Sequence, residues 1–185
     1  MDFINIILGF FVGILSSYVF WLALVLTKPN IAISPFAVFY PSDGSLRVRI
    51  INKSRRQAVD IKVYLAVDEL TPRNTRRTIH TPNLNSDYRF ALEPKHKDMD
   101  FKWGIPTATT FIAYDGQKIL DLLAPSNGPE RRLLFTLSAT DALSGAKIVQ
   151  RVSYSHENLR HGMFVGGLVF EVVESNSNES VENEV

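Results

Sequence analysis

The sequence contains no cysteine, which excludes thiol chemistry, disulfide bonds and cysteine-ligated metal sites. It has no P-loop, no G-x-G-x-x-G and no G-x-S-x-G motif, and no spacing of serine, histidine and aspartate that nominates a catalytic triad. His156 and His161 in "HENLRH" are five residues apart, about 140° around a helix, so they do not converge as zinc ligands at i and i+4 do. His80 and His96 stand alone in polar segments and are predicted to face solvent. We therefore expect a protein that is not an enzyme and that holds no metal and no cofactor.

Charge is absent from residues 3–27, an apolar run of 25 residues. As a helix this run is about 37 Å long, which crosses a hydrocarbon core of about 30 Å with some tilt. A cleaved signal peptide would begin with basic residues and have a shorter apolar stretch, whereas this chain begins with Asp2. A buried core helix is the alternative. Residues 1–28 are predicted to be a retained transmembrane anchor.

Basic residues follow the anchor and do not precede it, beginning with Lys28 and Arg47. By the positive-inside tendency, the C-terminal domain of this single-pass protein is predicted to be cytoplasmic, at the inner membrane if the source is bacterial. In the opposite orientation, Asn52 in "NKS" and Asn178 in "NES" would become glycosylation acceptors.

Small residues fall on one stripe of the anchor helix, with Phe20 among them; they are Gly9, Gly13, Ser16 and Ala23. Such a stripe lets a second helix approach closely within lipid. We expect a homo-oligomer, the alternative being that glycine is simply common in membrane helices.

The charges beyond the anchor are unevenly distributed. Residues 28–173 carry all 20 Lys and Arg against 14 Asp and Glu, whereas residues 174–185 carry four Glu and no base. Residues 29–173 are predicted to be one domain, and residues 174–185 a disordered acidic tail.

Alternating apolar residues predict antiparallel strands in this domain. "SLRVRIINK" places Leu46, Val48 and Ile50 on one face, and "VDIKVYLAV" does the same for Val59, Ile61, Val63, Leu65 and Val67. Residues 41–44 are predicted to be a turn and residues 114–118 a hairpin tip. Residues 68–87 are predicted to be a long loop with an edge strand, and residues 124–130 and 139–147 to be connections.

The last predicted strand is "FVGGLVFEVV", in which Gly166 and Gly167 indicate a bulge or a close backbone approach. Seven or eight such strands, with no long amphipathic helix, predict a mainly β fold. The predicted fold class is an antiparallel β-sandwich preceded by one transmembrane helix.

Two stretches resemble the cytoplasmic domain of inward-rectifier potassium channels. Residues 137–164 are similar to the late strands of that domain, with His161 where the family has tryptophan; the matching residues are Asp141, Ser153, Tyr154, Glu157 and Gly162. Residues 45–67 are similar to its early pair of strands through Arg49, Asn52 and Arg55.

The resemblance implies an immunoglobulin-like sandwich beneath a membrane helix. It does not imply a channel, because the second transmembrane helix and the Thr-Val-Gly-Tyr-Gly filter are both missing from this sequence. The lipid site of the family does not carry over either, since Lys28 alone stands between the apolar run and Pro29.

Two clusters of arginine are candidate contacts for anionic lipid or a small anionic ligand. Arg55 and Arg56 lie in a turn that is expected near the membrane, together with Lys28, while Arg73, Arg76 and Arg77 lie in the long loop. The alternative is a solvated basic edge. Nucleic acid polymers are not expected, because no aromatic residues interleave with these arginines. Asp98 and Asp100, flanked by Lys95, Lys97 and Lys102, predict a salt-laced surface.

These observations predict an interaction or sensor module, anchored in membrane lipids, that binds a protein or a small anionic ligand. The alternative is a membrane-disrupting or pore-forming effector, of the bacterial defence type, triggered by a small anion such as a nucleotide. A tethered enzyme is the least favoured hypothesis.

Overall fold

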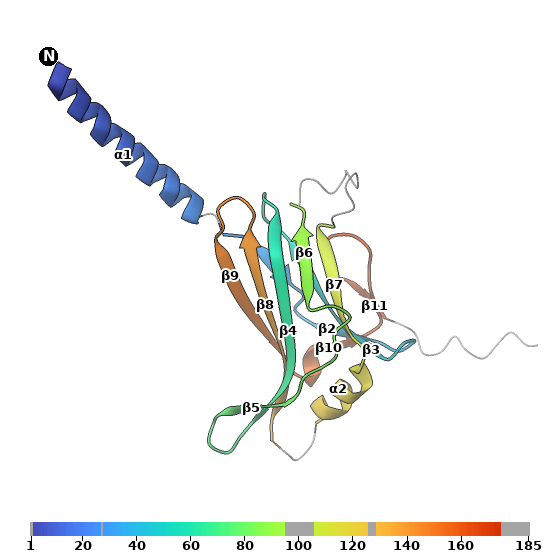
Figure 1. Cartoon of the computed structure of the whole chain (residues 1–185). Helices are drawn as coiled ribbons and strands as arrows, with labels where there is room; N and C mark the ends of the chain where they lie inside the picture. Colours follow the sequence, from blue (N-terminus) through green and yellow to red (C-terminus); the bar gives the residue numbers. More distant parts are fainter. Residues whose placement is uncertain (1, 27, 95–105, 126–128, 175–185) are drawn as a thin grey trace, which may run out of the picture.

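The computed structural model describes residues 2–26, 28–94, 106–125 and 129–174. Helix α1, Asp2–Leu26, stands clear of the remainder of the chain (Figure 1). Its segment Phe3–Leu24 is long and apolar enough to cross a membrane, and the rest of the protein buries none of it. This helix is therefore either a membrane anchor or a signal sequence.

The first sheet contains five strands: β1 (Ile31–Ile33), β2 (Ala37–Tyr40), β3 (Ser45–Asn52), β7 (Ala108–Ala113) and β10 (Leu159–His161). Strand β3 is central, because β1 and β2 pair with one of its sides and β7 with the other, all antiparallel. Strand β10 extends the sheet by pairing in parallel with β2.

The second sheet contains β4 (Ala58–Leu70), β5 (Arg76–His80), β6 (Tyr88–Leu92), β8 (Arg131–Asp141) and β9 (Lys147–Tyr154). All of its pairings are antiparallel, and the strand order is β5-β4-β8-β9, with β6 also paired to β4. Together the two sheets form an immunoglobulin-like β-sandwich, which confirms the predicted fold class.

The core lies between the two sheets and follows the predicted alternation. Leu46, Val48 and Ile50 of β3 face Ile61, Val63 and Leu65 of β4, and each of these side chains is at most 6% exposed. Burying one such side chain stabilises the fold by about 1.5–3 kcal/mol relative to leaving it exposed. Tyr154 from β9 is fully buried in the same cluster.

The prediction for Val59 was wrong, because β4 contains a bulge. Asp60 has a positive φ of 49°, and the register with β8 shifts between Val59 and Lys62. An extra residue in one strand reverses which side chains face inward. As a result Ala58 is fully buried in the core, while Val59 is only half-buried.

Residues 114–118 do not form the predicted hairpin tip; they lead instead into helix α2, Gly116–Leu123. Ile119 and Leu123 of this helix are buried in the core. Gly116 packs directly on the turn between β2 and β3, where a Cβ atom would lie 2.5 Å from the carbonyl oxygen of Gly44. This close approach requires glycine, so the Asp-Gly pair marks a helix start here and not a hairpin.

The predicted long loop at residues 68–87 is shorter than expected. Residues 68–70 continue β4, and β5 returns beside them after the turn at residues 71–75. The amide N–H of Thr71 donates to the carbonyl of Thr75 over 2.9 Å, and Asn74 adopts a positive φ of 57°. The predicted edge strand is therefore confirmed as one arm of a tight hairpin.

The predicted final strand is wrong as well. Two short strands, β11 (Met163–Phe164) and β12 (Val172–Val173), form a hairpin instead of one continuous strand. A Cβ atom on Gly166 would meet open space, so no close approach exists there. The turn between these strands needs Gly167, whose φ is +91°.

This C-terminal hairpin lies against the first sheet, with the ring of Phe164 stacked on that of Phe36 at 6.0 Å. The Arg49 guanidinium donates to the carbonyl oxygens of Val165 and Val169. Burial by the hairpin lowers the pKa of Arg49 below its ordinary value. Arg49, which the strand pattern places away from the core, is thus covered by a segment far along the chain.

Candidate functional site

The predicted basic residues separate to opposite ends of the sandwich. Strand β4 joins the two ends, and its 13 residues span about 43 Å. The turn with Arg55 and Arg56 precedes β4 and lies at the end where α1 joins, whereas Arg73, Arg76 and Arg77 follow β4 at the far end (Figure 1). The six predicted contacts are therefore two surfaces, not one site.

The first surface, the anchor-proximal end, comprises Lys28 and the turn at residues 53–57. The Lys53 amide N–H donates to the carbonyl of Asn30 over 2.7 Å, and Ile31 is in register with Asn52. Asn30 follows the end of α1 at Leu26 by only four residues and so lies within about 14 Å of the helix end, and the turn is hydrogen-bonded to it.

Asn52 holds the shape of this turn from within. Its side chain is fully buried, and its Nδ2 donates to the carbonyls of Arg56 and Leu92 over 2.9 and 3.1 Å. Its Oδ1 accepts from the amide and hydroxyl of Ser54 at 3.0 and 2.6 Å. A glycan on Nδ2 is incompatible with this arrangement, so the "NKS" sequence is not an acceptor in the folded domain. Asn178 lies outside the described residues.

The basic side chains at this end of the sandwich differ in their surroundings. Arg56 lies 3.6 Å from the carboxylate of Asp141, whose side chain is 2% exposed. Arg56 therefore forms an ion pair within the domain. Lys28, Lys53 and Arg55 are exposed. Lys147, at the start of β9, is also exposed and pairs in register with Thr140, close to the same end. Sequence reasoning did not single out Lys147, because its neighbourhood depends on the β8–β9 pairing.

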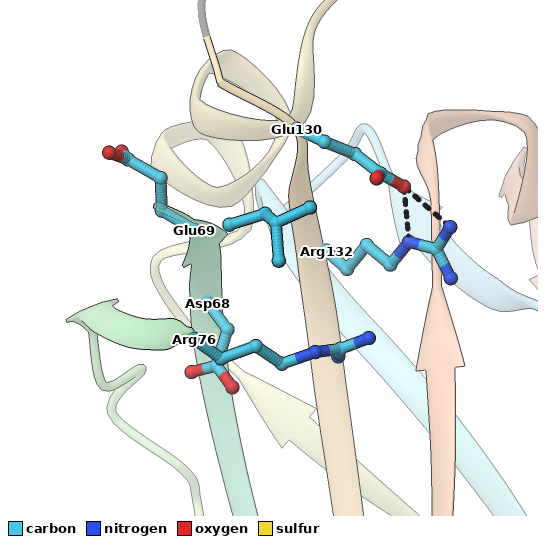
Figure 2. Close-up of a pocket in the computed structure, with 6 residues that line it drawn as sticks. Asp68, Glu69, Arg76, Glu130 and Arg132 are labelled. Carbon is cyan, nitrogen blue, oxygen red and sulfur yellow. Dashed lines mark hydrogen bonds and ion pairs between the residues drawn. The ribbon is translucent and has the colours of Figure 1, made fainter. Parts of the chain in front are cut away.

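The second surface, at the far end, is less basic than its sequence suggests. Arg76 lines a shallow pocket of about 50 Å³ with Asp68, Glu69, Leu70, Glu130 and Arg132. Arg132 is bonded to Glu130 at 2.5 Å, and Figure 2 shows that no such bond joins Arg76 to the other residues drawn. Arg131 forms an ion pair with Glu69 at 3.3 Å. Three carboxylates and two guanidinium groups line this pocket, so it does not favour an anion.

Asp68 is the buried acid of that pocket, at 9% exposure. Its carboxylate accepts a hydrogen bond of 2.8 Å from the Thr78 hydroxyl of β5. Arg73 and Arg77 are exposed on the hairpin, in the turn and on β5 respectively. These two arginines are the remaining candidates at this end for a small anionic ligand.

His80 was predicted to face solvent, and this prediction was wrong. It ends β5 with its Nε2 2.5 Å from the Asp115 carboxylate, and the two side chains are only 15% and 25% exposed. The second carboxylate oxygen of Asp115 is buried without a hydrogen-bond partner among the described residues. The pair ties β5 to the start of α2. No sequence signal linked two residues 35 positions apart.

The two histidines of "HENLRH" lie apart, in different elements. His156 begins the short helix η3 (His156–Asn158), and His161 ends β10. The ring of His161 packs on Phe39 at 5.5 Å. In the part of the chain that the structure describes, no group of three or more His, Asp or Glu is arranged to hold a metal ion.

The predicted helix-packing residues lie on an exposed helix. Gly9 and Gly13 would accept a Cβ atom with nothing within 4 Å of it, and Ser16 and Ala23 are exposed. His96 and the charged cluster of Asp98 and Asp100 with Lys95, Lys97 and Lys102 lie outside the described residues.

No protein-family model matches the chain, and no curated protein sequence matches it. Among solved structures, the crystal structure of the periplasmic chaperone SfaE is similar over 71% of this chain at 9% identity, with a TM-score of 0.36. This chain spans only 56% of that chaperone. The X-ray structure of the structural genomics target SoR45 is similar over 75% of this chain and 95% of that one, also at 9% identity, with a TM-score of 0.33.

Proposed function

We propose that this chain is a non-enzymatic, single-pass membrane protein whose β-sandwich is a cytoplasmic interaction or sensor module. The observation that carries this proposal is the arrangement of α1: an apolar helix with none of its span buried by the protein, joined to a basic end of the sandwich. In water such a surface is costly, at about 25 cal/mol for each Å² of apolar area. A bilayer removes that cost.

Contact between the anchor-proximal end and an anionic leaflet is part of this proposal. Lys28, Lys53 and Arg55 are exposed there, and each base near such a surface contributes about 1 kcal/mol. The attraction supports a cytoplasmic position for the sandwich, since anionic lipids are concentrated on that side. The resemblance to inward-rectifier cytoplasmic domains supports the same architecture, a sandwich beneath a membrane helix.

Self-association through α1 completes the proposal. The stripe of Gly9, Gly13, Ser16 and Ala23 is open on the surface of the helix. Two copies packed along this stripe would bring their sandwiches together on one side of the membrane. Binding of a protein or a small anion to the sandwich would then change how the helices pack.

Membrane residence and orientation are tested on the full chain expressed in cells. We expect the protein to resist extraction by alkaline carbonate and to retain its N-terminal residues, as measured by mass spectrometry of the intact protein. Protease should digest the sandwich only after the membrane is opened. Loss of residues 1–26 from the mature protein would identify a signal sequence and overturn the proposal, as would digestion from outside intact cells.

Oligomerisation is tested by crosslinking in membranes. Gly9→Leu with Gly13→Leu should reduce the crosslinked fraction, whereas Ile14→Leu, on the opposite side of the helix, should leave it unchanged. Equal crosslinking in all three proteins would remove self-association from the proposal. Leakage of a dye from liposomes that carry the full chain would instead support the pore-forming alternative.

A further inference from the structure

The turn between β8 and β9, residues 142–146, lies at the anchor-proximal end of the sandwich. The Ala142 amide N–H donates to the carbonyl of Gln57 over 3.1 Å, which joins this turn to the turn at residues 53–57. Figure 1 shows the β8–β9 turn at the end of the sandwich where α1 joins. A bilayer crossed by α1 would therefore lie next to this turn.

The side chain of Leu143 projects from this turn into solvent. It is 68% exposed, and Ala142 before it is exposed as well. Single exposed apolar side chains are common on protein surfaces and need no partner. The meaning of this one therefore depends on how firmly the turn presents it and on what surrounds it.

The turn holds Leu143 outward through hydrogen bonds to a buried acid. Oδ1 of Asp141 accepts from the amide N–H of Leu143 at 3.1 Å, and from the amide and hydroxyl of Ser144 at 2.7 and 2.9 Å. Gly145 follows with a φ of +69°, a conformation that glycine adopts without a steric penalty. Leu143 can fold back onto the domain only if these bonds break, so the turn keeps it in solvent.

Exposed basic residues surround Leu143. Lys147 follows it at the start of β9, and Lys53 and Arg55 stand on the neighbouring turn. Asp141 is buried and paired with Arg56, so its charge does not face outward. An apolar side chain among bases suits the surface of an anionic leaflet, because the bases attract the headgroups and the apolar group enters the boundary with the acyl chains.

A second apolar loop reaches the same end of the sandwich. It connects β11 to β12, and its Phe170 ring lies 5.9 Å from Nζ of Lys53. Val169, the residue before Phe170, is 39% exposed. The basic turn at residues 53–57 therefore has an exposed apolar side chain on each of two neighbouring loops, which is more than a single scattered leucine.

We propose that Leu143 inserts into the headgroup region of the anionic leaflet beside α1, with Val169 as a second apolar contact and Lys53, Arg55 and Lys147 on the lipid headgroups. The insertion fixes the orientation of the sandwich relative to the bilayer. This proposal rests on the proposed membrane anchoring and goes beyond it, because it names the side chain that enters the lipid.

The absence of cysteine allows a test with one fluorescent label at a time. The full chain carries Leu143→Cys, Tyr114→Cys or Ile14→Cys, each labelled with nitrobenzoxadiazole, in vesicles of phosphatidylcholine and phosphatidylserine that contain a nitroxide-labelled lipid. Tyr114 is the matched control, because it is 62% exposed and precedes α2 at the far end. Ile14 reports whether α1 is in the bilayer.

We expect the lipid nitroxide to quench the label at residue 143 at least about threefold more strongly than the label at residue 114, because an inserted apolar group lies about 5–10 Å into the interface. Equal quenching at residues 143 and 114, with strong quenching at residue 14, would overturn this proposal and leave the anchoring intact. Absence of quenching at residue 14 would overturn the proposed function as well.

The role of the basic residues is tested in the protein labelled at residue 143. Arg55→Glu with Lys147→Glu should lower the lipid quenching at least about twofold, because each lost base removes attraction to the anionic surface. Arg73→Glu with Arg77→Glu, the same charge change at the far end, should leave the quenching unchanged. Equal quenching in the two variants would overturn the contact between these bases and the leaflet.

Discussion

The phenol of Tyr154 donates a 2.7 Å hydrogen bond to the backbone carbonyl of Ser34, and both residues are fully buried. Tyr154 belongs to β9 of one sheet, whereas Ser34 lies between β1 and β2 of the other. The bond therefore joins the two sheets directly. It also satisfies the Ser34 carbonyl, which has no access to water.

Tyr154→Phe keeps the ring but leaves that carbonyl without its donor. We expect a loss of about 1–2 kcal/mol in the free energy of unfolding, measured by urea denaturation followed by fluorescence. Tyr64→Phe is the control, because Tyr64 is 49% exposed on β4. An equal loss in both proteins would contradict the role of the bond.

Alkaline pH should unfold the domain through the same residue. Burial raises the pKa of Tyr154 above its ordinary value of 10.0. The folded state therefore holds a proton that the unfolded state releases first, so stability is intact below pH 10 and falls as the pH rises above it. Tyr154→Phe should flatten this part of the pH profile. A profile with the same slope in the variant would assign the loss to other groups.

Gly162→Ala tests the close contact between Gly162 and the C-terminal hairpin. Gly162 has a φ of +140°, and its new Cβ atom would lie 2.1 Å from the carbonyl oxygen of Val173. We expect the segment beyond residue 162 to become sensitive to protease, with more than about 1 kcal/mol lost. Gly166→Ala, which meets open space, should behave as the parent protein. Protease resistance in both variants would contradict the close approach.

Asn52→Asp tests the anchor-proximal turn. The carboxylate would face the carbonyl oxygens of Arg56 and Leu92, which now accept from Nδ2. We expect a loss of about 2–3 kcal/mol at neutral pH, measured by urea denaturation. Burial raises the pKa of such an acid, so part of the loss should be recovered as the pH falls and the carboxyl group regains a proton. Asn83→Asp, at an exposed position, should have little effect at either pH.

The His80–Asp115 pair is tested by a double-mutant cycle with His80→Ala and Asp115→Ala. Because the two side chains lie 2.5 Å apart and are mostly buried, we expect a coupling free energy of about 0.5–3 kcal/mol. The measurement is thermal or urea unfolding of the four proteins. Additive losses would show that the pair does not couple β5 to α2.

Local pattern alone determined the elements of this protein whose physics is local. An uncharged run at residues 3–27 predicts a helix that no other element buries, and alternation at Leu46, Val48 and Ile50 predicts a strand with one face in the core. The Asp-Gly pair at residues 115–116 led to the wrong prediction of a hairpin tip, because its turn propensity is equally compatible with a helix start.

The tertiary structure decided which polar side chains stay exposed and which pair with one another within the domain. Arg56 finds Asp141 and His80 finds Asp115 only after strands distant in sequence have paired. The bulge at Asp60 likewise moves Val59 out of the core through a register shift that no alternation encodes. Periodicity reports which residues share a face within one element, whereas pairing between elements decides what each face meets.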